Sequence, residues 1–307
     1  MPNFVECANG LLFPEGPIAM PDGSVVLVEI RRGTLSRVDP NGAVEVVADL
    51  GGGPNGAAIG PDGRCYVCNN GGFEWMQIGD NFIPGEQPDD YSGGRIEVVD
   101  LATGKSEVLY SECNGIPLRG PNDIVFDRSG GFYFTDLGKT RKREIDRGAV
   151  YYAMPDGSSI REVRFPVTTP NGVGLSPAED VLYVAETTTS RLLGYPIVSP
   201  GELAPVPEWE ALIAGFSNFQ LFDSLGVDAA GNVCVATLVN GGITIISPDG
   251  KSTKHVATGD PMTTNICFGG DGLRTAYITC SMTGRLIRCE WETPGHPLNF
   301  LNVDPRV

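Results

Sequence analysis

One pattern of polar and apolar positions recurs six times along the chain of 307 residues. Each copy begins with a polar residue, called its head here, followed by a short apolar segment, a turn and a second apolar segment. The segments are rich in Val, Ile, Tyr and Phe, and Pro-Asp-Gly at 21–23 and 61–63 supplies tight turns, so the pattern predicts β-hairpins. The six heads are Glu15, Asn55, Asn122, Asn171, Asp223 and Asn265.

The spacing of the heads predicts the fold. They lie 40, 67, 49, 52 and 42 residues apart, and intervals of this size suit one four-stranded blade of a β-propeller each. Apolar residues at consecutive strand positions agree with sheets that are packed on both faces. The sequence therefore predicts an all-β fold in which residues 1–307 form a single six-bladed β-propeller domain. Residues 4–8 are expected to join the last blade near residues 285–290 and so close the ring.

The heads are expected to meet at one mouth of the propeller, because the innermost strand of each blade lines the central channel. A turn centred near Asp22 places a carboxylate opposite Glu15, and the same counting places carboxylates opposite two further heads. The three opposite residues are Glu29, Asp136 and Glu186. One mouth of the channel would then be ringed with oxygen atoms.

The carboxylates among the heads indicate a bound metal ion. For Asn55 and Asn265 a turn role is favoured, because asparagine tolerates the left-handed backbone conformation. Glu15 and Asp223 lack that explanation, since carboxylates are unfavourable in strands and two of them in a narrow channel repel each other unless a cation lies between them. Carboxylate and carboxamide oxygens suit a hard cation. The sequence thus predicts one divalent metal ion in the centre, Ca²⁺ first, with Mg²⁺, Mn²⁺ or Zn²⁺ as alternatives.

Charge and composition exclude several other classes of protein. A formal net charge of −16 repels nucleic-acid phosphates and anionic lipids, so neither a nucleic-acid nor a membrane partner is expected. The two histidines, His255 and His296, stand in no recognisable motif, which argues against histidine-dependent triads and zinc sites. The eight cysteines are interpreted as buried free thiols. Without a secretory leader or an apolar span of membrane length, a cytoplasmic location is expected, and the oligomeric state stays open.

Five short motifs, in order and with blade spacing, resemble the regucalcin and gluconolactonase-like family of six-bladed propellers, also called the senescence marker protein family. The motifs lie at residues 13–17, 120–136, 170–177, 222–228 and 264–270. The resemblance implies a single divalent metal ion bound by Glu15, Asn171 and Asp223, with Asn122 close by, and the hydrolysis of a lactone. In one respect the chain departs from the family, because Arg119 precedes Asn122 by three residues where regucalcin-type proteins have an arginine two residues before.

Roles for individual residues follow from such a centre as hypotheses. A metal ion would polarise the lactone carbonyl and lower the pKa of water without a histidine. Asp223 is the candidate base, with a purely ligating role or direct nucleophilic attack as the alternatives. Asn122 is the second catalytic candidate, since it would orient the substrate or complete the metal shell. Asp123 is the weaker candidate of that pair, and Asp123 and Arg119 are predicted to contact the substrate.

An insertion at residues 71–94 makes the interval between the second and third heads too long for a hairpin loop. Its aromatic residues Phe73, Trp75, Phe82 and Tyr91 are predicted to form a lid, with Trp75 and Tyr91 in contact with the substrate. A surface loop with its own small cluster explains them equally well. The basic stretch 139–147 leaves the same mouth, and a solvated loop is favoured there over contact with an anionic substrate.

Two other functions stay open. A phosphotriesterase of the same architecture needs the same set of oxygen ligands, so a lactone panel and an organophosphate panel would be required to separate them. A non-enzymatic calcium-binding propeller would hold a structural ion, and such a site is usually closed by protein ligands on every side. Only three or four protein ligands can be identified here, which leaves room for a small-molecule lactone substrate and favours catalysis.

Overall fold

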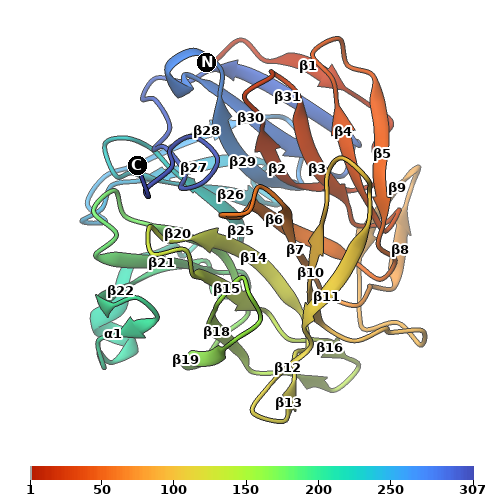
Figure 1. Ribbon diagram of the computed structural model, residues 1–307. Helices are drawn as coiled ribbons and strands as arrows, with labels where there is room; N and C mark the ends of the chain where they lie inside the picture. The colour runs from red at the N-terminus through yellow and green to blue at the C-terminus, as the bar shows by residue number, and fades with distance from the viewer. Residues whose placement is uncertain (1) are drawn as a thin grey trace.

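Six antiparallel sheets surround a central channel in the computed structural model, which describes residues 2–307 (Figure 1). Each sheet has four strands in its main path, and the sheets follow one another around the ring in chain order. The predicted six-bladed propeller is confirmed, and the fold is nearly all-β. Within the described residues no helix has the length and apolar character needed to span a bilayer.

The first two blades are regular four-stranded sheets. Blade 1 consists of β2 (Pro14–Ala19), β3 (Val25–Glu29), β4 (Thr34–Val38) and β5 (Val44–Asp49). Blade 2 consists of β6 (Pro54–Ile59), β7 (Cys65–Asn69), β10 (Arg95–Val99) and β11 (Ser106–Tyr110). Between β7 and β10 the insertion forms its own hairpin of β8 (Trp75–Ile78) and β9 (Asn81–Pro84).

The next two blades carry short additions. Blade 3 consists of β14 (Pro121–Phe126), β15 (Phe132–Asp136), β18 (Gly148–Ala153) and β19 (Ile160–Val167). Two small hairpins flank it, formed by β12 (Glu112–Cys113), β13 (Ile116–Pro117), β16 (Thr140–Arg141) and β17 (Glu144–Ile145). Blade 4 consists of β20 (Pro170–Leu175), β21 (Val181–Glu186), β22 (Arg191–Ser199), β23 (Glu202–Leu203), the one-turn α1 (Glu208–Ala211) and β24 (Leu212–Gly215).

The last two blades complete the ring. Blade 5 consists of β25 (Leu221–Val227), β26 (Val233–Leu238), β27 (Gly242–Ile246) and β28 (Thr253–Ala257). Blade 6 consists of β29 (Thr263–Gly269), the 3₁₀ turn η1 (Asp271–Leu273), β30 (Thr275–Cys280), β31 (Arg285–Glu290) and β1 (Val5–Ala8). Val5 pairs with Arg288 and Glu6 with Ile287, so the predicted closure of the ring by the N-terminal strand is confirmed.

Apolar side chains fill the interfaces between neighbouring blades. Between blades 2 and 3, the buried Tyr66 packs on Phe126 and Phe132 with ring centroids 5.1 Å and 5.7 Å apart. Both faces of the inner strands are therefore buried, which explains their runs of consecutive apolar residues. All eight cysteines are free, as expected, and six of them are buried.

The register of the inner hairpins differs by one residue from the prediction. Glu29 lies opposite Pro14 and not opposite Glu15, because a bulge shifts the pairing between Glu15 and Ile18. The same irregularity places Asp136 opposite Pro121. The predicted ring of facing carboxylates is therefore wrong for Glu29, Asp136 and Glu186.

These three carboxylates instead hold the backbone of the loops beside the heads. Asp136 accepts hydrogen bonds from the backbone N–H groups of Arg119, Gly120 and Gly138 at 2.7–2.9 Å. Glu186 accepts one from the N–H of Thr168 at 3.0 Å. A carboxylate satisfied by backbone donors positions the loop and has little capacity left for a ligand.

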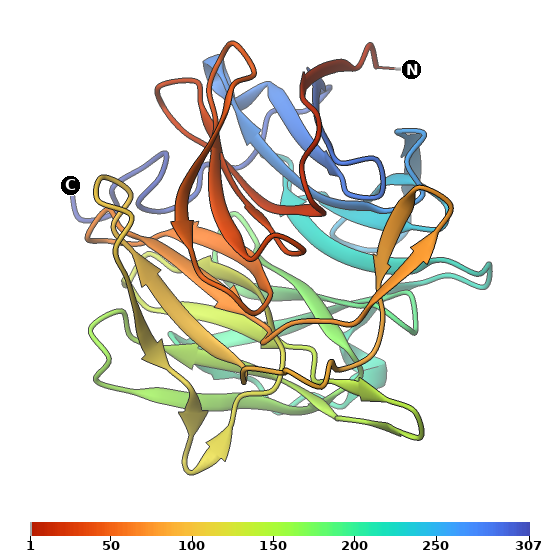
Figure 2. The same cartoon turned by 90° about the vertical axis from the view of Figure 1, so that its right-hand side faces the viewer.

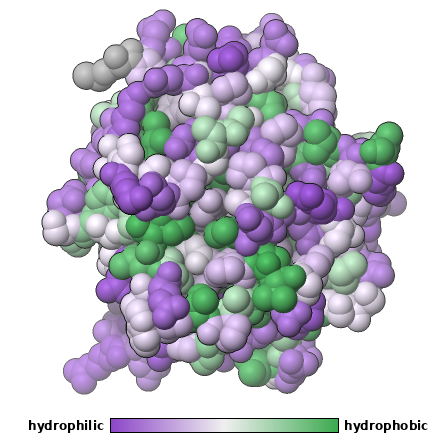
Figure 3. All heavy atoms as spheres, turned by 90° about the vertical axis from the view of Figure 1, so that its left-hand side faces the viewer, coloured by the Kyte–Doolittle hydropathy of each residue, from purple (hydrophilic) through white to green (hydrophobic). Residues whose placement is uncertain are grey.

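The two ends of the central channel are called the front mouth, where the heads lie, and the rear mouth. Figure 2 shows the front side of the propeller, with the hairpin β8–β9 of the insertion in orange standing before the blades. Figure 3 shows the rear side, where hydrophobic side chains gather across the middle of the face. Behind the heads the channel contains a cavity of about 110 Å³ lined by the second halves of the inner strands and by Leu298 and Leu301.

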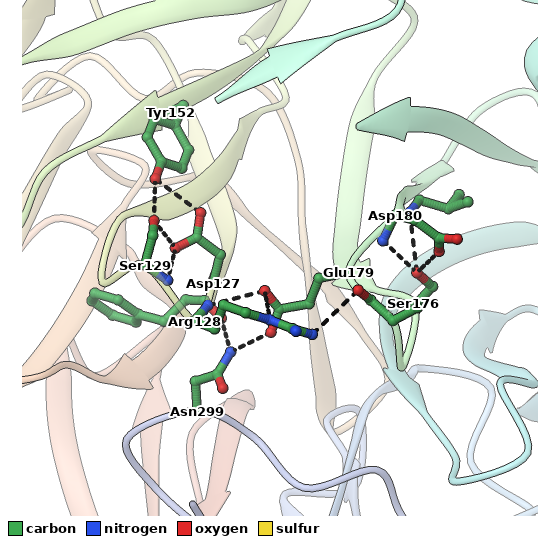
Figure 4. Close-up of polar contacts among 11 residues, drawn as sticks. Asp127, Arg128, Ser129, Tyr152, Ser176, Glu179, Asp180 and Asn299 are labelled. Carbon is green, nitrogen blue, oxygen red and sulfur yellow. Dashed lines mark hydrogen bonds and ion pairs between the residues drawn. The ribbon is translucent and has the colours of Figure 1, made fainter. Parts of the chain in front are cut away.

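The C-terminal segment, residues 291–307, crosses the rear mouth. Its Gly295 forms a β-bridge with Asp228 of blade 5, and the ring of Phe300 packs edge-on against Phe126 of blade 3, with centroids 5.9 Å apart. Figure 4 shows Asn299 donating to the Glu179 carboxylate at 2.7 Å, and it also donates to the Phe126 carbonyl at 3.2 Å. The segment thus ties three blades together and forms part of the rear wall of the cavity.

Candidate functional site

The six heads occupy equivalent places on the six innermost strands. Each is the second or third residue of its strand, at the front end, in β2, β6, β14, β20, β25 and β29. Neighbouring inner strands contact one another all the way around the ring. The heads Glu15 and Asn265 are joined directly, because Asn265 Nδ2 donates to Glu15 Oε2 at 2.7 Å. The predicted convergence of the heads near the axis is therefore seen in the structure.

Glycines directly after the heads allow this convergence. Gly16 has a positive φ of 52°, and a Cβ built there would lie 2.5 Å from the carbonyl oxygen of Asn55. A Cβ on Gly56 would lie 2.5 Å from the carbonyl oxygen of Asn122. Only glycine lets the front ends of blades 1, 2 and 3 approach so closely. In the sequence, a glycine directly after Glu15 or Asn55 indicates that two inner strands approach closely at that point. The spacing of the heads alone does not indicate this.

Three of the heads have buried oxygen atoms without any hydrogen-bond partner. These atoms are Glu15 Oε1, Asn122 Oδ1 and Asn171 Oδ1. The three side chains are only 2–4% exposed, so water does not reach them freely. Leaving a buried acceptor unpaired costs about 1–3 kcal/mol, and more when it is charged. A cation satisfies several such acceptors at once, so the orphaned oxygens fit the predicted metal ion.

The carboxyl groups of the channel are destabilised in their charged forms. Burial raises the pKa of Glu15 well above its ordinary value, and the neighbouring Asp223 adds to this. Burial likewise raises the pKa of Asp223 to about 7, although a hydrogen bond from Asn171 acts in the opposite direction. A divalent cation among these groups would reverse the effect and favour the carboxylates.

Asp223 differs from the other three predicted residues in its accessibility. Glu15, Asn122 and Asn171 are buried, whereas the side chain of Asp223 keeps part of its surface exposed. No cluster of three or more His, Cys, Asp or Glu side chains able to hold a metal ion exists among residues 2–307. The donor set is instead mixed, with two carboxylates and two carboxamides. Such oxygen sets suit Ca²⁺ and Mg²⁺ better than softer metals.

The structure places Asp123 between blades 3 and 4. Its Oδ1 accepts a hydrogen bond from the N–H of Ile124 at 3.0 Å, and its Oδ2 accepts one from the N–H of Val173 in blade 4 at 3.1 Å. Burial raises its pKa to about 7. With both oxygens bonded to the backbone, Asp123 joins two inner strands, and its predicted contact with the substrate stays a prediction.

The other three predicted substrate residues lie on the front side. Arg119 has an exposed side chain, and its carbonyl accepts a hydrogen bond from the Tyr91 hydroxyl at 2.6 Å. That hydroxyl also accepts one from the N–H of Gly94 at 3.0 Å. Trp75 packs edge-on against Phe13, with ring centroids 5.2 Å apart. Their contact with substrate stays a prediction, and the hydroxyl of Tyr91 is already engaged within the protein.

Lys139 is the functional candidate that the sequence did not reveal. It opens the basic stretch 139–147, for which a solvated loop was favoured, and for Lys139 this is wrong because only 1% of the residue is exposed. Lys142, Arg143 and Arg147 are exposed, as the hypothesis requires. No local pattern distinguishes one buried lysine within a basic run from its exposed neighbours.

The protein is of the class of six-bladed propellers that gather carboxylate and carboxamide oxygens at the front mouth. Its similarity to known proteins gives the family. The chain belongs to the SMP-30/gluconolactonase/LRE-like family, whose model matches residues 13–282. The family resemblance predicted from the motifs is thereby confirmed.

Individual relatives are distant but cover most of the chain. A gluconolactonase of Zymomonas mobilis is 26% identical over 89% of this chain and 78% of its own length. The lactonase drp35 of Staphylococcus haemolyticus is 30% identical over 77% of this chain and 66% of its own. Regucalcin from Agrobacterium tumefaciens, described as a calcium-binding protein, superposes with a TM-score of 0.75 at 18% identity over 95% of each chain.

Proposed function

We propose that the protein is a metal-dependent lactonase that opens the ring of a small lactone. The observation that carries this proposal is the set of three buried, unpartnered oxygens on Glu15, Asn122 and Asn171 around the partly exposed Asp223. The names of the relatives, gluconolactonase and lactonase, support the reaction class.

Glu15, Asn171 and Asp223 would hold the metal ion, with Asn122 beside them. Ca²⁺ is the first choice, because all donors are oxygens and because regucalcin is described as calcium-binding. When bound, the ion supplies Lewis acidity for the ester carbonyl of the lactone.

The chain's own residues supply proton transfer and orientation. Asp223, the one partly exposed residue of the four, is suited to accept the proton of the attacking water. The water oxygen bonds to the carbonyl carbon, the ring C–O bond breaks, and the proton passes from Asp223 to the released alkoxide. Asn122 would orient the lactone carbonyl from the neighbouring inner strand.

The decisive experiment measures proton release from five- and six-membered lactones in a weakly buffered assay. It uses the protein as purified, after chelation, and after addition of single divalent metals. Acid release that is lost on chelation and restored by one metal is the expected result. Without release under any metal, turnover of an organophosphate run in parallel would indicate a phosphotriesterase. If neither substrate reacts but calcium binds, the protein is a binding propeller and the proposal is wrong.

A further inference from the structure

A buried lysine lies beside the front mouth, outside the set of heads. Lys139 follows β15 and is 1% exposed. Its Nζ donates hydrogen bonds to the carbonyl of Gly72 at 2.6 Å and to Asn70 Oδ1 at 3.1 Å. The same Nζ lies 4.1 Å from the centre of the Phe73 ring and 5.4 Å from that of Tyr91. The ammonium group is thus enclosed by a carbonyl, an amide and two aromatic faces.

No carboxylate is bonded to the ammonium group of Lys139, although its backbone N–H donates to Asp146 Oδ2 at 3.1 Å. Lys139 forms no ion pair within residues 2–307. The acidic groups that act on the pKa of Lys139 are Asp136 at the end of β15 and Asp146. Asp136 accepts hydrogen bonds from backbone N–H groups, and Asp146 pairs with Arg141. Burial lowers the pKa of Lys139 to about 7, with both aspartates acting in the opposite direction. A cation held without a counter-charge destabilises the fold, so its contacts call for another explanation.

The contacts of Lys139 join the two ends of the insertion. Gly72 and Phe73 belong to its first residues, and Tyr91 belongs to its last. Lys139 therefore fastens both ends of the insertion to the front of blade 3. In between, the insertion spreads over the front side of the neighbouring blade. Trp75 packs on Phe13, two residues before the head Glu15.

We infer that Lys139 is a positioning residue that holds the insertion at the front mouth, so that the insertion covers the bound lactone. This inference rests on the proposed function for the role of the mouth, but the fastening itself does not depend on it. Its hydrogen bonds to the Gly72 carbonyl and to Asn70, with its contact to the Phe73 ring, fasten the insertion, whereas burial of the charge itself is unfavourable. Because burial lowers the pKa of Lys139 to about 7, protonation favours release of the buried amine, so the insertion should be held more tightly above pH 7 than below it.

The first test measures amide hydrogen exchange of residues 71–94 in Lys139→Met and in the matched control Lys142→Met. Both variants lose one positive charge from the same loop, but Lys142 is exposed. Exchange in the insertion should accelerate by about tenfold in Lys139→Met and stay unchanged in the control, as loss of the hydrogen bonds and the ring contact predicts. Equal exchange in the two variants would overturn the inference.

A second variant guards against misfolding of the first. Asn70 Nδ2 is buried without a partner, so Asn70→Asp removes no hydrogen bond and places a carboxylate against the lysine. This variant should slow exchange of the insertion at pH 7 and below, because an opposite charge raises the pKa of Lys139 and offsets the cost of burying its ammonium group. If exchange at that pH is unchanged, Lys139 is not the group that controls the insertion.

Kinetics then separate the inference from the proposed function. With the best lactone, KM should rise by about tenfold in Lys139→Met while kcat changes less, because the insertion contributes to binding more than to bond cleavage. Faster exchange with an unchanged KM would overturn the covering role. Absence of lactone hydrolysis in the unaltered protein would refute the proposed function alone, since the exchange experiment is read without any substrate.

Discussion

The two ends of the central channel are built from the same six strands and differ in how their polar groups are satisfied. At the front mouth three buried oxygens have no partner, and burial raises the pKa of the carboxyl groups. At the rear, Glu179 pairs with Arg128 at 3.1 Å and accepts from Asn299 at 2.7 Å (Figure 4). The polar groups described at the rear mouth are satisfied within the protein, whereas those at the front mouth need a ligand.

The unpaired oxygens indicate the functional end of the channel better than the position of the cavity does. The rear cavity of about 110 Å³ is lined mostly by aliphatic and aromatic residues, and the C-terminal segment forms part of its wall. Unpaired buried acceptors are unfavourable for stability, and a fold that keeps three of them at one point indicates a bound partner there.

The largest effect is expected from Asp223→Asn. Loss of a general base lowers kcat by a factor of about 10²–10⁴, and the asparagine, which has nearly the same shape, should leave the fold intact. Initial rates of lactone hydrolysis and a thermal unfolding curve measure both. Asp249→Asn, at an exposed turn, serves as the control. An active Asp223→Asn variant would refute its assignment as base.

Calcium should stabilise the protein through the front mouth. At a free concentration about 100-fold above its Kd, a ligand adds about 2.7 kcal/mol to the free energy of unfolding. Thermal unfolding with and without calcium measures this, and Glu15→Gln, which removes a charged ligand, should reduce the shift. Equal shifts in the two proteins would show that the ion binds elsewhere.

The metal-free protein should lose stability as the pH rises from about 4 to about 7. Burial raises the pKa of Asp223 from 3.8 to about 7, so in this window the folded state binds more protons than the unfolded state. Its stability is then greatest at the acidic end and declines until Asp223 is ionised. Unfolding midpoints in chelator, compared with those of Asp223→Asn, measure the effect. The variant should show a shallower decline, and identical profiles would exclude Asp223 as the source.

The smallest effect is expected at the rear mouth. Asn299→Ala removes the donor to Glu179 and to the carbonyl of Phe126, which should lower the free energy of unfolding by about 1–3 kcal/mol. Because this end holds no reacting group, kcat and KM should stay within twofold, roughly, of the original values. Urea unfolding and steady-state kinetics measure the two. A large loss of activity would mean that the two ends are coupled.

Repetition explains why much of the fold could be predicted. Six heads at blade spacing indicate six equivalent strands, and equivalence places Glu15, Asn171 and Asp223 around one axis without knowledge of any contact. The pairing of residues across the hairpins was predicted less well. The bulge after Glu15 adds one residue to the inner strand, which counting outward from the turn does not include, so Glu29 does not face the head.

Features outside the repeat could not be predicted in the same way. Lys139 lies in a basic run whose other lysine is exposed, and its burial depends on Phe73 and Tyr91 from an insertion in another blade. The rear closure depends on Asn299, which stands in a segment without periodicity. Both are contacts between segments distant in sequence, and a single sequence does not encode them as a local pattern.

The closure of the ring by β1 also determines an order of events during synthesis. This strand leaves the ribosome before any blade does. Its partner β31 is synthesised only after almost the whole chain has been made. Until β31 is made, the N-terminal strand has no native edge to pair with, and five blades must wait as an open arc. The open arc exposes a sheet edge that can pair with a strand of another chain. Nascent chains stalled before β31 should therefore aggregate more readily than finished ones. The strand that is translated first is the one that ends this vulnerable period.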